Sequence, residues 1–544
     1  MSSVFASPPA GSTAYSSGST GSGRLFLWSV VASLAGFLFG FDTVVISGAE
    51  QTIQALWNLG AGMHGVVMGS ALYGTVLGSM IGSWPTDRFG RKPTLLSIGV
   101  LYLISAVWTG LANDPWSFIV ARFIGGLGIG ICTVTAPLYI SEISPPDRRG
   151  RLAGMFQFNI VLGILVAFLS NFLLKGIGEN AWRWMMASAA FPSIIYTFAC
   201  FLIPESPRWL FNRRRKAEAR QVLGRIMPGA TDETIDAYAA EISEAGRASA
   251  ASATGFWTRR LRKPICLAFF IAFFNQLSGI NAVLYFAPRI FGLTGSENVL
   301  AQSIGIGITN LVFTFVGLWL IDRLGRRTLL YIGSFGYILS LGLCATAFFT
   351  WAPQFRAASA AVDAKQAVAD LAGANPARVA SRTAELEAKV LALTHAAADP
   401  AAGVTPVSLP AGATPDQIKT TANTTLQQAS EATGRGGLMV LLCIFAFIAS
   451  HAIGQGAVIW VFISEIFPDS YRASGQSLGS ATHWVFAALL TTVFPIMMAA
   501  FAPGYVFLFF TFMMVLQLIW VKRMVPETKG VALEEIQKQL GIAP

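Results

Sequence analysis

The chain has 544 residues, of which 54% are hydrophobic and only 12% are charged, and its mean hydropathy is +0.58. Soluble domains carry roughly 25% charged residues, so this composition excludes an ordinary soluble protein and predicts a membrane protein. The formal net charge of +10 does not indicate nucleic-acid binding, because the basic residues form short clusters between apolar runs. Such clusters are typical of the positive-inside pattern of membrane proteins.

The first 24 residues differ from the rest of the chain. They are rich in Ser, Gly, Pro and Ala, and residues 1 to 23 carry no charged side chain. A signal peptide begins with basic residues, so this composition argues against one. We expect a disordered cytoplasmic tail.

Apolar segments long enough to span a bilayer recur along the chain. A hydrocarbon core of about 30 Å requires about 20 apolar residues per helix, and this criterion predicts an all-α membrane protein with twelve spanning helices. Six of them fall in residues 25 to 204 and six in residues 264 to 525. The expected spans are 25 to 48, 63 to 85, 93 to 111, 115 to 140, 152 to 174, 182 to 204, 264 to 291, 298 to 321, 327 to 351, 437 to 464, 473 to 500 and 502 to 525.

Residues 205 to 263 separate the two sets of helices and contain basic clusters at 213 to 216 and 259 to 263. The positive-inside rule places this linker in the cytoplasm. An even number of spans on each side then places both termini there, including a tail of residues 526 to 544. The Ala and Glu content of the linker predicts short amphipathic helices on the membrane surface.

Residues 352 to 435 are polar and rich in Ala and Thr, and the predicted topology places them on the outer side. The run from 376 to 396 has helical composition, so we expect a small helical cap outside the membrane. This segment is either a tolerated loop insertion or a lid or docking surface.

Three charged motifs occur twice, at matching positions in the two sets of helices, and this pairing indicates an internal duplication. They follow the second, fourth and sixth helix of each set. The paired residues are Asp87 and Arg91 with Asp322 and Arg326, Glu142 and Arg149 with Glu465 and Arg472, and Glu205 and Arg208 with Glu527 and Lys529.

Charged groups at cytoplasmic helix ends are suited to a gate. Ion pairs between helices can hold two bundles together in one conformation and separate in another. Anchoring of helix ends explains the Arg and Lys residues but not the repeated Asp and Glu residues. The predicted gating residues are Asp87, Arg91, Glu142, Arg149, Glu205, Arg208, Asp322, Arg326, Glu465 and Arg472, with Tyr285 of the seventh span.

These motifs, with Pro-Glu-Ser-Pro-Arg at 204 to 208 and Pro-Glu-Thr-Lys-Gly at 526 to 530, resemble the signature of the sugar porter family of the major facilitator superfamily. They are most like those of its bacterial xylose and glucose proton symporters. The resemblance spans nearly the whole chain except the first tail and the insertion at 352 to 435. It implies two pseudo-symmetric six-helix bundles around a central site that opens alternately to each side.

Two ionisable residues lie inside predicted spans, where burying a charge in the membrane is energetically unfavourable and indicates a specific role. At 1.5 Å per residue, Asp42 of the first span and Arg122 of the fourth both lie about 10 Å from the outer surface and can pair. The pair is either a proton switch, with the carboxylate protonated when the pair opens, or a static contact that orients two helices. The resemblance favours the switch, because proton-coupled sugar porters have Asp at this position and passive facilitators typically have Asn.

A sugar site requires neutral amides, which both donate and accept hydrogen bonds, and aromatic faces. Gln276 of the seventh span and Asn310 of the eighth both lie about 18 Å deep, and Gly279 can break the seventh helix. A single amide there would serve equally well as a hydrogen bond between helices. The resemblance implies a sugar-binding set of Gln157, Asn275, Gln276, Asn281, Asn310 and Trp460, with His483 where some relatives place a polar sugar contact.

Three features depart from the family pattern. Asn275 stands where Gln is usual, Ala452 stands where glucose facilitators have Glu, and residues 454 to 457 lack the prolines that hinge the tenth helix in many relatives. The preferred sugar and the gating of that helix are therefore left open. We assign no role to His64 or His395.

The favoured function is import of a monosaccharide such as xylose, glucose or galactose by proton symport through Asp42 and Arg122. A uniporter with the same sugar site is the main alternative. A sensor that does not transport is disfavoured, because such proteins rely on a long cytoplasmic tail and only 19 residues follow the last span.

An enzyme is not expected, because the sequence contains no cluster of metal ligands, no catalytic nucleophile paired with a general base, and no phosphate-binding loop. Its five cysteines all lie in apolar stretches and suggest neither a metal site nor a disulfide framework. No cofactor is expected. The expected partners are a monosaccharide, protons and the lipid bilayer, without nucleic acid, and the chain is expected to be a monomer in a bacterial inner membrane.

Overall fold

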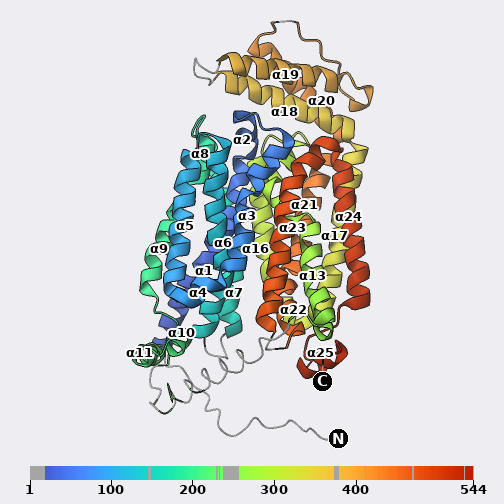
Figure 1. The fold of residues 1–544 in the computed structure, drawn as a ribbon. Helices are drawn as coiled ribbons and strands as arrows, with labels where there is room; N and C mark the ends of the chain where they lie inside the picture. The colour runs from blue at the N-terminus through green and yellow to red at the C-terminus, as the bar shows by residue number, and fades with distance from the viewer. Residues whose placement is uncertain are drawn as a thin grey trace.

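The computed structural model describes residues 19–144, 149–227, 231, 233, 235–236, 240, 256–372, 379–410, 412–468, 471–531 and 533–542. Across these ranges the chain forms helices and no β-strand. Twelve helices within these ranges are long and apolar enough to cross a membrane, which confirms the predicted all-α fold (Figure 1).

The N-terminal half, residues 19–202, contains the first six candidate spans. Its elements are α1 (Ser19–Val45), η1 (Ile46–Gly48), α2 (Glu50–Leu56), α3 (Ala61–Ile81), α4 (Ser83–Phe89), α5 (Arg91–Leu111), α6 (Pro115–Ile143), α7 (Arg149–Leu174), α8 (Ala181–Ala187), α9 (Ala190–Ala199) and η2 (Cys200–Leu202). Local sequence sets the helix starts. Asp114, for example, caps α6 by accepting from the backbone N–H groups of Trp116 and Ser117, each at 3.0 Å.

The C-terminal half, residues 256–531, contains the other six candidate spans. Its membrane elements are α13 (Arg262–Leu277), α14 (Ile280–Tyr285), α15 (Ala287–Gly292), α16 (Val299–Leu324), α17 (Arg326–Thr350), α21 (Gly436–Ile453), α22 (Gln455–Ile466), α23 (Arg472–Ala500) and α24 (Pro503–Met524), with η3 (Arg259–Leu261) before α13.

Two spans of this half are interrupted at glycines. Gly279 has φ +87° between α13 and α14, a conformation that side chains disfavour, and a Cβ there would lie 2.8 Å from the Phe510 ring. This confirms the predicted break. Gly454 interrupts the tenth span between α21 and α22 although no proline is present, and a Cβ there would lie 2.8 Å from the Cα of Gly333.

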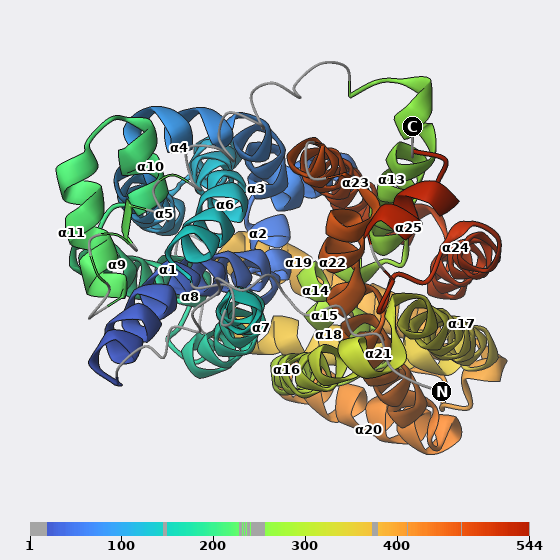
Figure 2. The same cartoon turned by 90° about the horizontal axis from the view of Figure 1, so that it is seen from below.

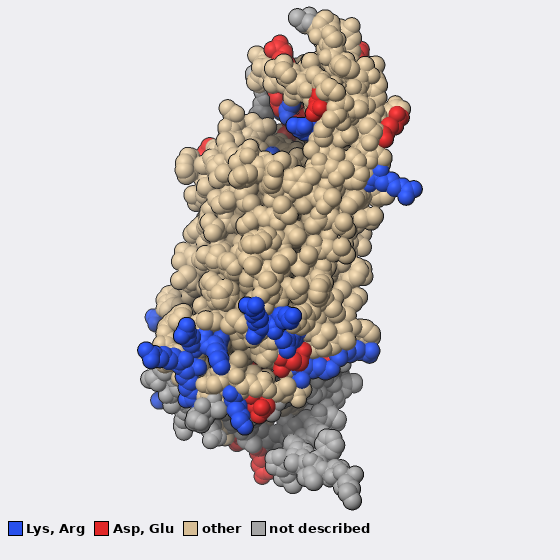
Figure 3. Space-filling model, turned by 90° about the vertical axis from the view of Figure 1, so that its right-hand side faces the viewer, with Lys and Arg blue, Asp and Glu red and all other residues tan. Residues whose placement is uncertain are grey.

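The two halves lie side by side and contact each other through α3 with α23 and α7 with α16 (Figure 2). At one end, here called the basic end, lie α10 (Pro207–Asn212), α11 (Lys216–Ile226) and α25 (Leu533–Gln539) (Figure 1). Lys and Arg gather at this end on the face in Figure 3, and charged side chains are absent from the middle band of that face. Large apolar side chains such as Phe198 and Phe335 are exposed along the helices, as expected of surfaces that contact lipid.

The opposite end, here called the cap end, carries the insertion. It folds into α18 (Ala352–Ala372), α19 (Val379–Ala397), η5 (Pro400–Ala402) and α20 (Pro415–Thr433), in agreement with its helical composition. These helices enclose a small core that includes Ala361, Leu393 and Ile418. A salt bridge of 2.6 Å between Lys365 and Glu297 connects α18 to the loop before α16.

Candidate functional site

Asp42 of α1 and Arg122 of α6 form a buried ion pair, as their shared depth predicts. Nη1 of Arg122 lies 2.5 Å from Oδ1 of Asp42, and Nη2 donates to the Asp42 carbonyl at 3.2 Å. Asp42 is 5% exposed and Arg122 is 1% exposed. Among the described residues, Oδ2 of Asp42 and Nε of Arg122 have no hydrogen-bond partner. One oxygen of the carboxylate is therefore left without a partner in this ion pair.

Three amides of the seventh span form a hydrogen-bonded chain around the break at Gly279. Asn281 Nδ2 donates to Gln276 Oε1 at 2.8 Å, and Gln276 Nε2 donates to Asn275 Oδ1 at 3.1 Å. Gln276 Nε2 also lies 3.1 Å from a ring nitrogen of His483 on α23. The break allows α14 to bring Asn281 back against Gln276, so four of the predicted sugar-binding residues lie together.

Aromatic rings continue this cluster toward the N-terminal half. The His483 ring lies 5.3 Å from that of Trp460 and 4.8 Å from that of Trp484. Trp484 in turn contacts Phe39 of α1 at 5.4 Å, only three residues before Asp42. The buried Trp484 Nε1 has no partner among the described residues. The sequence-based set omitted Trp484, for which the only signal was its position beside His483.

Gln157 of α7 and Asn310 of α16 lie on helices that contact each other across the two halves. Gln157 is half-buried and Asn310 is buried, and neither side chain makes a hydrogen bond to another described residue. Asn159, two residues from Gln157, behaves differently, because it donates to Ser33 Oγ at 3.0 Å and to the Met155 carbonyl at 2.8 Å. Gln157 and Asn310 thus keep amide groups available to a ligand, whereas Asn159 packs helices together.

The duplicated charged motifs form matching clusters at the basic end. In the N-terminal half, Arg91 donates to both carboxylate oxygens of Glu142 at 2.8 and 2.9 Å, and Glu205 accepts from the Arg91 backbone N–H at 2.9 Å. In the C-terminal half, Arg326 donates to both oxygens of Glu465 at 3.1 and 2.7 Å. Burial raises the pKa of Glu205 despite the opposing backbone donors of Ser206, Arg91 and Lys92.

In this conformation, the ion pairs of these motifs between described residues each join residues of the same half. The physical reason is that Arg91 and Arg326 each begin a helix, and Glu142 and Glu465 each lie one residue before the end of another helix of the same half. Asp87 and Asp322 are mostly exposed and lie 3.3 and 3.4 Å from Arg91 and Arg326.

Arg472, Arg208 and Arg149 are the other arginines of the predicted gate. Arg472 donates from Nε to the Ser464 carbonyl at 2.9 Å. Arg208 makes no ion pair with another residue in the described ranges. The side chain of Arg149 lies outside what the structure describes.

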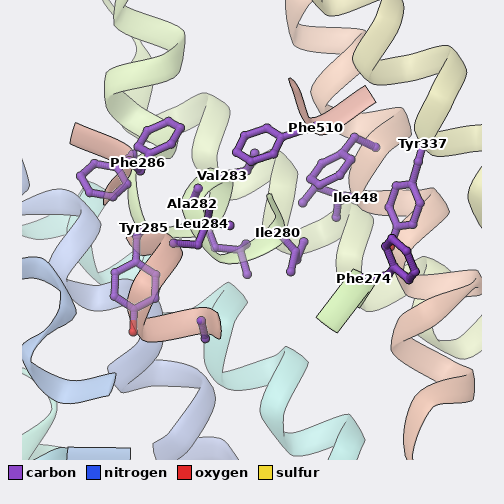
Figure 4. Close-up of a cluster of buried hydrophobic side chains, with 14 of the residues drawn as sticks. Phe274, Ile280, Ala282, Val283, Leu284, Tyr285, Phe286, Tyr337, Ile448 and Phe510 are labelled. Atoms are coloured by element: carbon purple, nitrogen blue, oxygen red, sulfur yellow. The ribbon is translucent and has the colours of Figure 1, made fainter. Parts of the chain in front are cut away.

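The two halves are closed against each other at the cap end. The Tyr73 hydroxyl lies 2.5 Å from Thr492 Oγ1, which joins α3 to α23. In the same region, Tyr285 and Phe286 are buried, and their rings point in opposite directions from the end of α14 (Figure 4). Phe286 contacts Phe494 of α23 with ring centroids 4.9 Å apart. Tyr285 therefore lies at the closed end of the central site.

Residues 28–362 and 419–540 match the family model described as Sugar (and other) transporter. The chain belongs to this family. It is 29% identical to the arabinose-proton symporter of Bacillus subtilis, covering 95% of each chain. It is 27% identical to the D-xylose-proton symporter of Escherichia coli, covering 95% of this chain and 96% of the relative. The protein is thus a multi-pass membrane protein of the sugar transporter family.

Solved structures agree with this membership. The partially occluded inward open conformation of the xylose transporter XylE from E. coli matches with a TM-score of 0.71 and 26% identity, covering 94% of this chain and 100% of that one. XylE bound to 6-bromo-6-deoxy-D-glucose matches with a TM-score of 0.65 and 26% identity, covering 96% and 100%. The family match omits residues 363–418, which contain most of the cap.

Proposed function

We propose that the protein imports a monosaccharide such as xylose, glucose or galactose by proton symport with alternating access. The observation that carries this proposal is the buried ion pair of Asp42 and Arg122, in which Oδ2 of Asp42 has no partner among the described residues. Phe39, three residues before Asp42, contacts Trp484 and so links this pair to the amide cluster. The similarity to relatives described as arabinose and xylose proton symporters supports the same function.

Proton coupling follows from the electrostatics of this pair. While Asp42 is ionised, its attraction to Arg122 holds α1 against α6. A proton on Oδ2 neutralises the carboxylate and weakens this attraction, so the two helices can shift relative to each other. A conformation in which the pair has re-formed must release the proton. When the proton binds from one side of the membrane and is released to the other, the proton gradient therefore shifts the equilibrium between the two conformations.

We assign sugar binding to Gln157, Asn275, Gln276, Asn281, Asn310, Trp460 and His483, and we add Trp484. Amides can match the donor and acceptor pattern of sugar hydroxyls, while the indole rings can cover the C–H faces of the sugar. The unpaired groups of Gln157, Asn310 and Trp484 support this assignment.

We place the basic end in the cytoplasm, because Lys and Arg gather there, and both termini with it. The cap then lies outside, and the two charged clusters are gates that meet when the basic end closes. We further propose a monomer in a bacterial inner membrane, with the lipid bilayer as a partner and without nucleic acid, and a protein with neither catalytic activity nor a cofactor.

A direct test is the pH of a lightly buffered suspension of de-energised proteoliposomes when sugar is added outside. Symport predicts an alkaline shift as protons enter with xylose or glucose, and no shift for Asp42→Asn. A uniporter, the second candidate, would equilibrate the sugar with no pH change in either protein.

A further inference from the structure

A buried cluster of polar side chains joins the two halves at the cap end. Oε1 of Glu50, the first residue of α2, lies 2.6 Å from Nη2 and 2.8 Å from Nε of Arg289 on α15. The same oxygen lies 2.6 Å from Nε2 of His64 on α3. Glu50 and His64 are 0% exposed, and the Arg289 side chain is 30% exposed. Arg289 also donates to Gln54 of α2.

This cluster differs from the other ion pairs of the molecule in its position. Glu50 and His64 belong to the N-terminal half, and Arg289 belongs to the C-terminal half. The remaining ion pairs between described residues lie within one half, within the linker, within the cap or between the cap and the C-terminal half. Separation of the halves at the cap end must therefore break the contact between Glu50 and Arg289.

The buried charge of Glu50 in the N-terminal half is stabilised by Arg289 of the C-terminal half. In the described ranges, the titratable groups that act on Glu50 are Arg289 of α15 and His64 of α3. Burial by itself raises the pKa of Glu50, but the attraction of Arg289 and the hydrogen bond to His64 outweigh it, so the pKa is lowered. Without Arg289, a fully buried carboxylate would keep only His64 as its partner, a costly arrangement that hydration would relieve.

Arg289 also lies close to the part of the chain that covers the central site. It follows Tyr285 by four residues and Phe286 by three, and α14 carries Asn281 of the amide cluster. A contact that fixes α15 against α2 thus fixes α14 over that cluster.

We propose that Glu50, His64 and Arg289 form an outer latch that holds the cap end closed and that each transport cycle must open. The three are positioning residues, because they act through α14 and α15 rather than by touching the sugar. This inference rests on the proposed alternating access, but the distance measurement that tests it is made without sugar and without a proton gradient.

The test is the distance between spin labels at Ile177 and Phe501, measured by double electron-electron resonance in a cysteine-free background that retains sugar uptake. These exposed positions lie in the cap-end loops of the N-terminal and C-terminal halves. The wild type is expected to give one main, short distance. Arg289→Gln is expected to raise the ratio of a longer, open population by about tenfold or more, because it leaves Glu50 buried without its cation.

Companion variants separate a latch from a general loss of packing. Glu50→Gln should open the cap end less than Arg289→Gln, because the partly exposed Arg289 can be hydrated. Glu50→Gln with Arg289→Gln should open it less than Arg289→Gln alone, since no charge is then left buried. Glu297→Gln, which removes an ion pair on the same outer face without touching the join between halves, should leave the distances unchanged.

The latch also predicts a kinetic signature. Arg289→Gln should change the maximal rate of sugar exchange severalfold while the KM changes less, because the sugar ligands are intact. Additive effects of the two latch variants, an equal effect of Glu297→Gln, or an unchanged distance in Arg289→Gln would overturn the proposal.

Discussion

Arg91 and Arg326 make the same contacts in the two halves of the chain. Each arginine begins a helix directly after a glycine, donates two hydrogen bonds to a glutamate at the end of a neighbouring helix, and has its backbone N–H bound by a second glutamate. The glutamates are Glu142 and Glu205 in one half and Glu465 and Glu527 in the other. The sequence duplication is thus also a duplication of geometry at the basic end.

The two clusters differ in burial, and this difference predicts unequal effects on stability. The Glu142 side chain is 2% exposed and that of Glu465 is 26% exposed. Glu142→Gln should lower the free energy of unfolding by about 3 kcal/mol, because it leaves Arg91 buried without its partner. Glu465→Gln should cost about 1 kcal/mol, since water reaches the position of Glu465 and can hydrate Arg326 from there. Denaturant unfolding of the detergent-solubilised variants measures both, and equal losses would contradict the assigned burial.

The amide cluster predicts a selective loss of sugar affinity. Gln276→Ala should raise the dissociation constant for the transported sugar about tenfold, because it removes the amide to which both Asn275 and Asn281 are bonded. Asn159→Ala is the matched control, because that amide bonds to Ser33 and Met155 within the N-terminal half. It should lower stability and leave sugar affinity unchanged. Equilibrium binding of labelled xylose and glucose compares the two variants, and a similar loss in both would contradict the site.

Removal of Arg122 should affect coupling more than sugar binding. Arg122→Gln leaves the buried Asp42 carboxylate without its cation, so the ion pair whose opening and closing would couple protons to the cycle cannot form. We expect gradient-driven accumulation to fall at least tenfold while binding of the sugar persists. The combination Arg122→Gln with Asp42→Asn should be more stable than Arg122→Gln, because no carboxylate is then left unpaired. If Arg122→Gln retained full accumulation, the pair would be a static contact between α1 and α6.

The outer latch predicts a pH dependence of defined sign. The pKa of Glu50 is lowered in the closed conformation, below the ordinary glutamate value of about 4.3. Its stabilisation of the closed form is therefore fully present above that value and is lost as the pH falls through the lowered one. Spin-label distances at the cap end, measured in an Asp42→Asn background to remove the coupling site, should stay constant from about pH 8 to pH 5. Opening centred near neutral pH would show that another group controls the latch.

Much of the architecture could be predicted because it depends on local sequence and on depth in the bilayer. Twelve apolar segments give twelve spans, and the rise of an α-helix places Asp42 and Arg122 at one depth, where they pair. The break at Gly279 was expected because glycine permits a backbone conformation that other residues disfavour. The break at Gly454 was not, since it occurs without proline and depends on close packing against Gly333.

Contacts between distant segments could not be predicted in the same way. The fourth span was expected to end at residue 140, but α6 continues to Ile143 and carries Glu142 into contact with Arg91 of the same half. The latch depends on how α2, α3 and α15 meet when the halves close, and hydropathy reports only their depth. His64 gave no signal by itself, because its partner Glu50 lies 14 residues away in a separate short helix.

The central claim is that Asp42 couples sugar movement to protons. Its most direct test is uptake of labelled xylose and glucose into proteoliposomes, with and without an inward proton gradient, for the wild type and Asp42→Asn. The account predicts gradient-driven accumulation in the wild type that is lost in Asp42→Asn, while exchange of sugar across the membrane survives. Accumulation unaffected by the gradient or by the substitution would contradict coupling through Asp42.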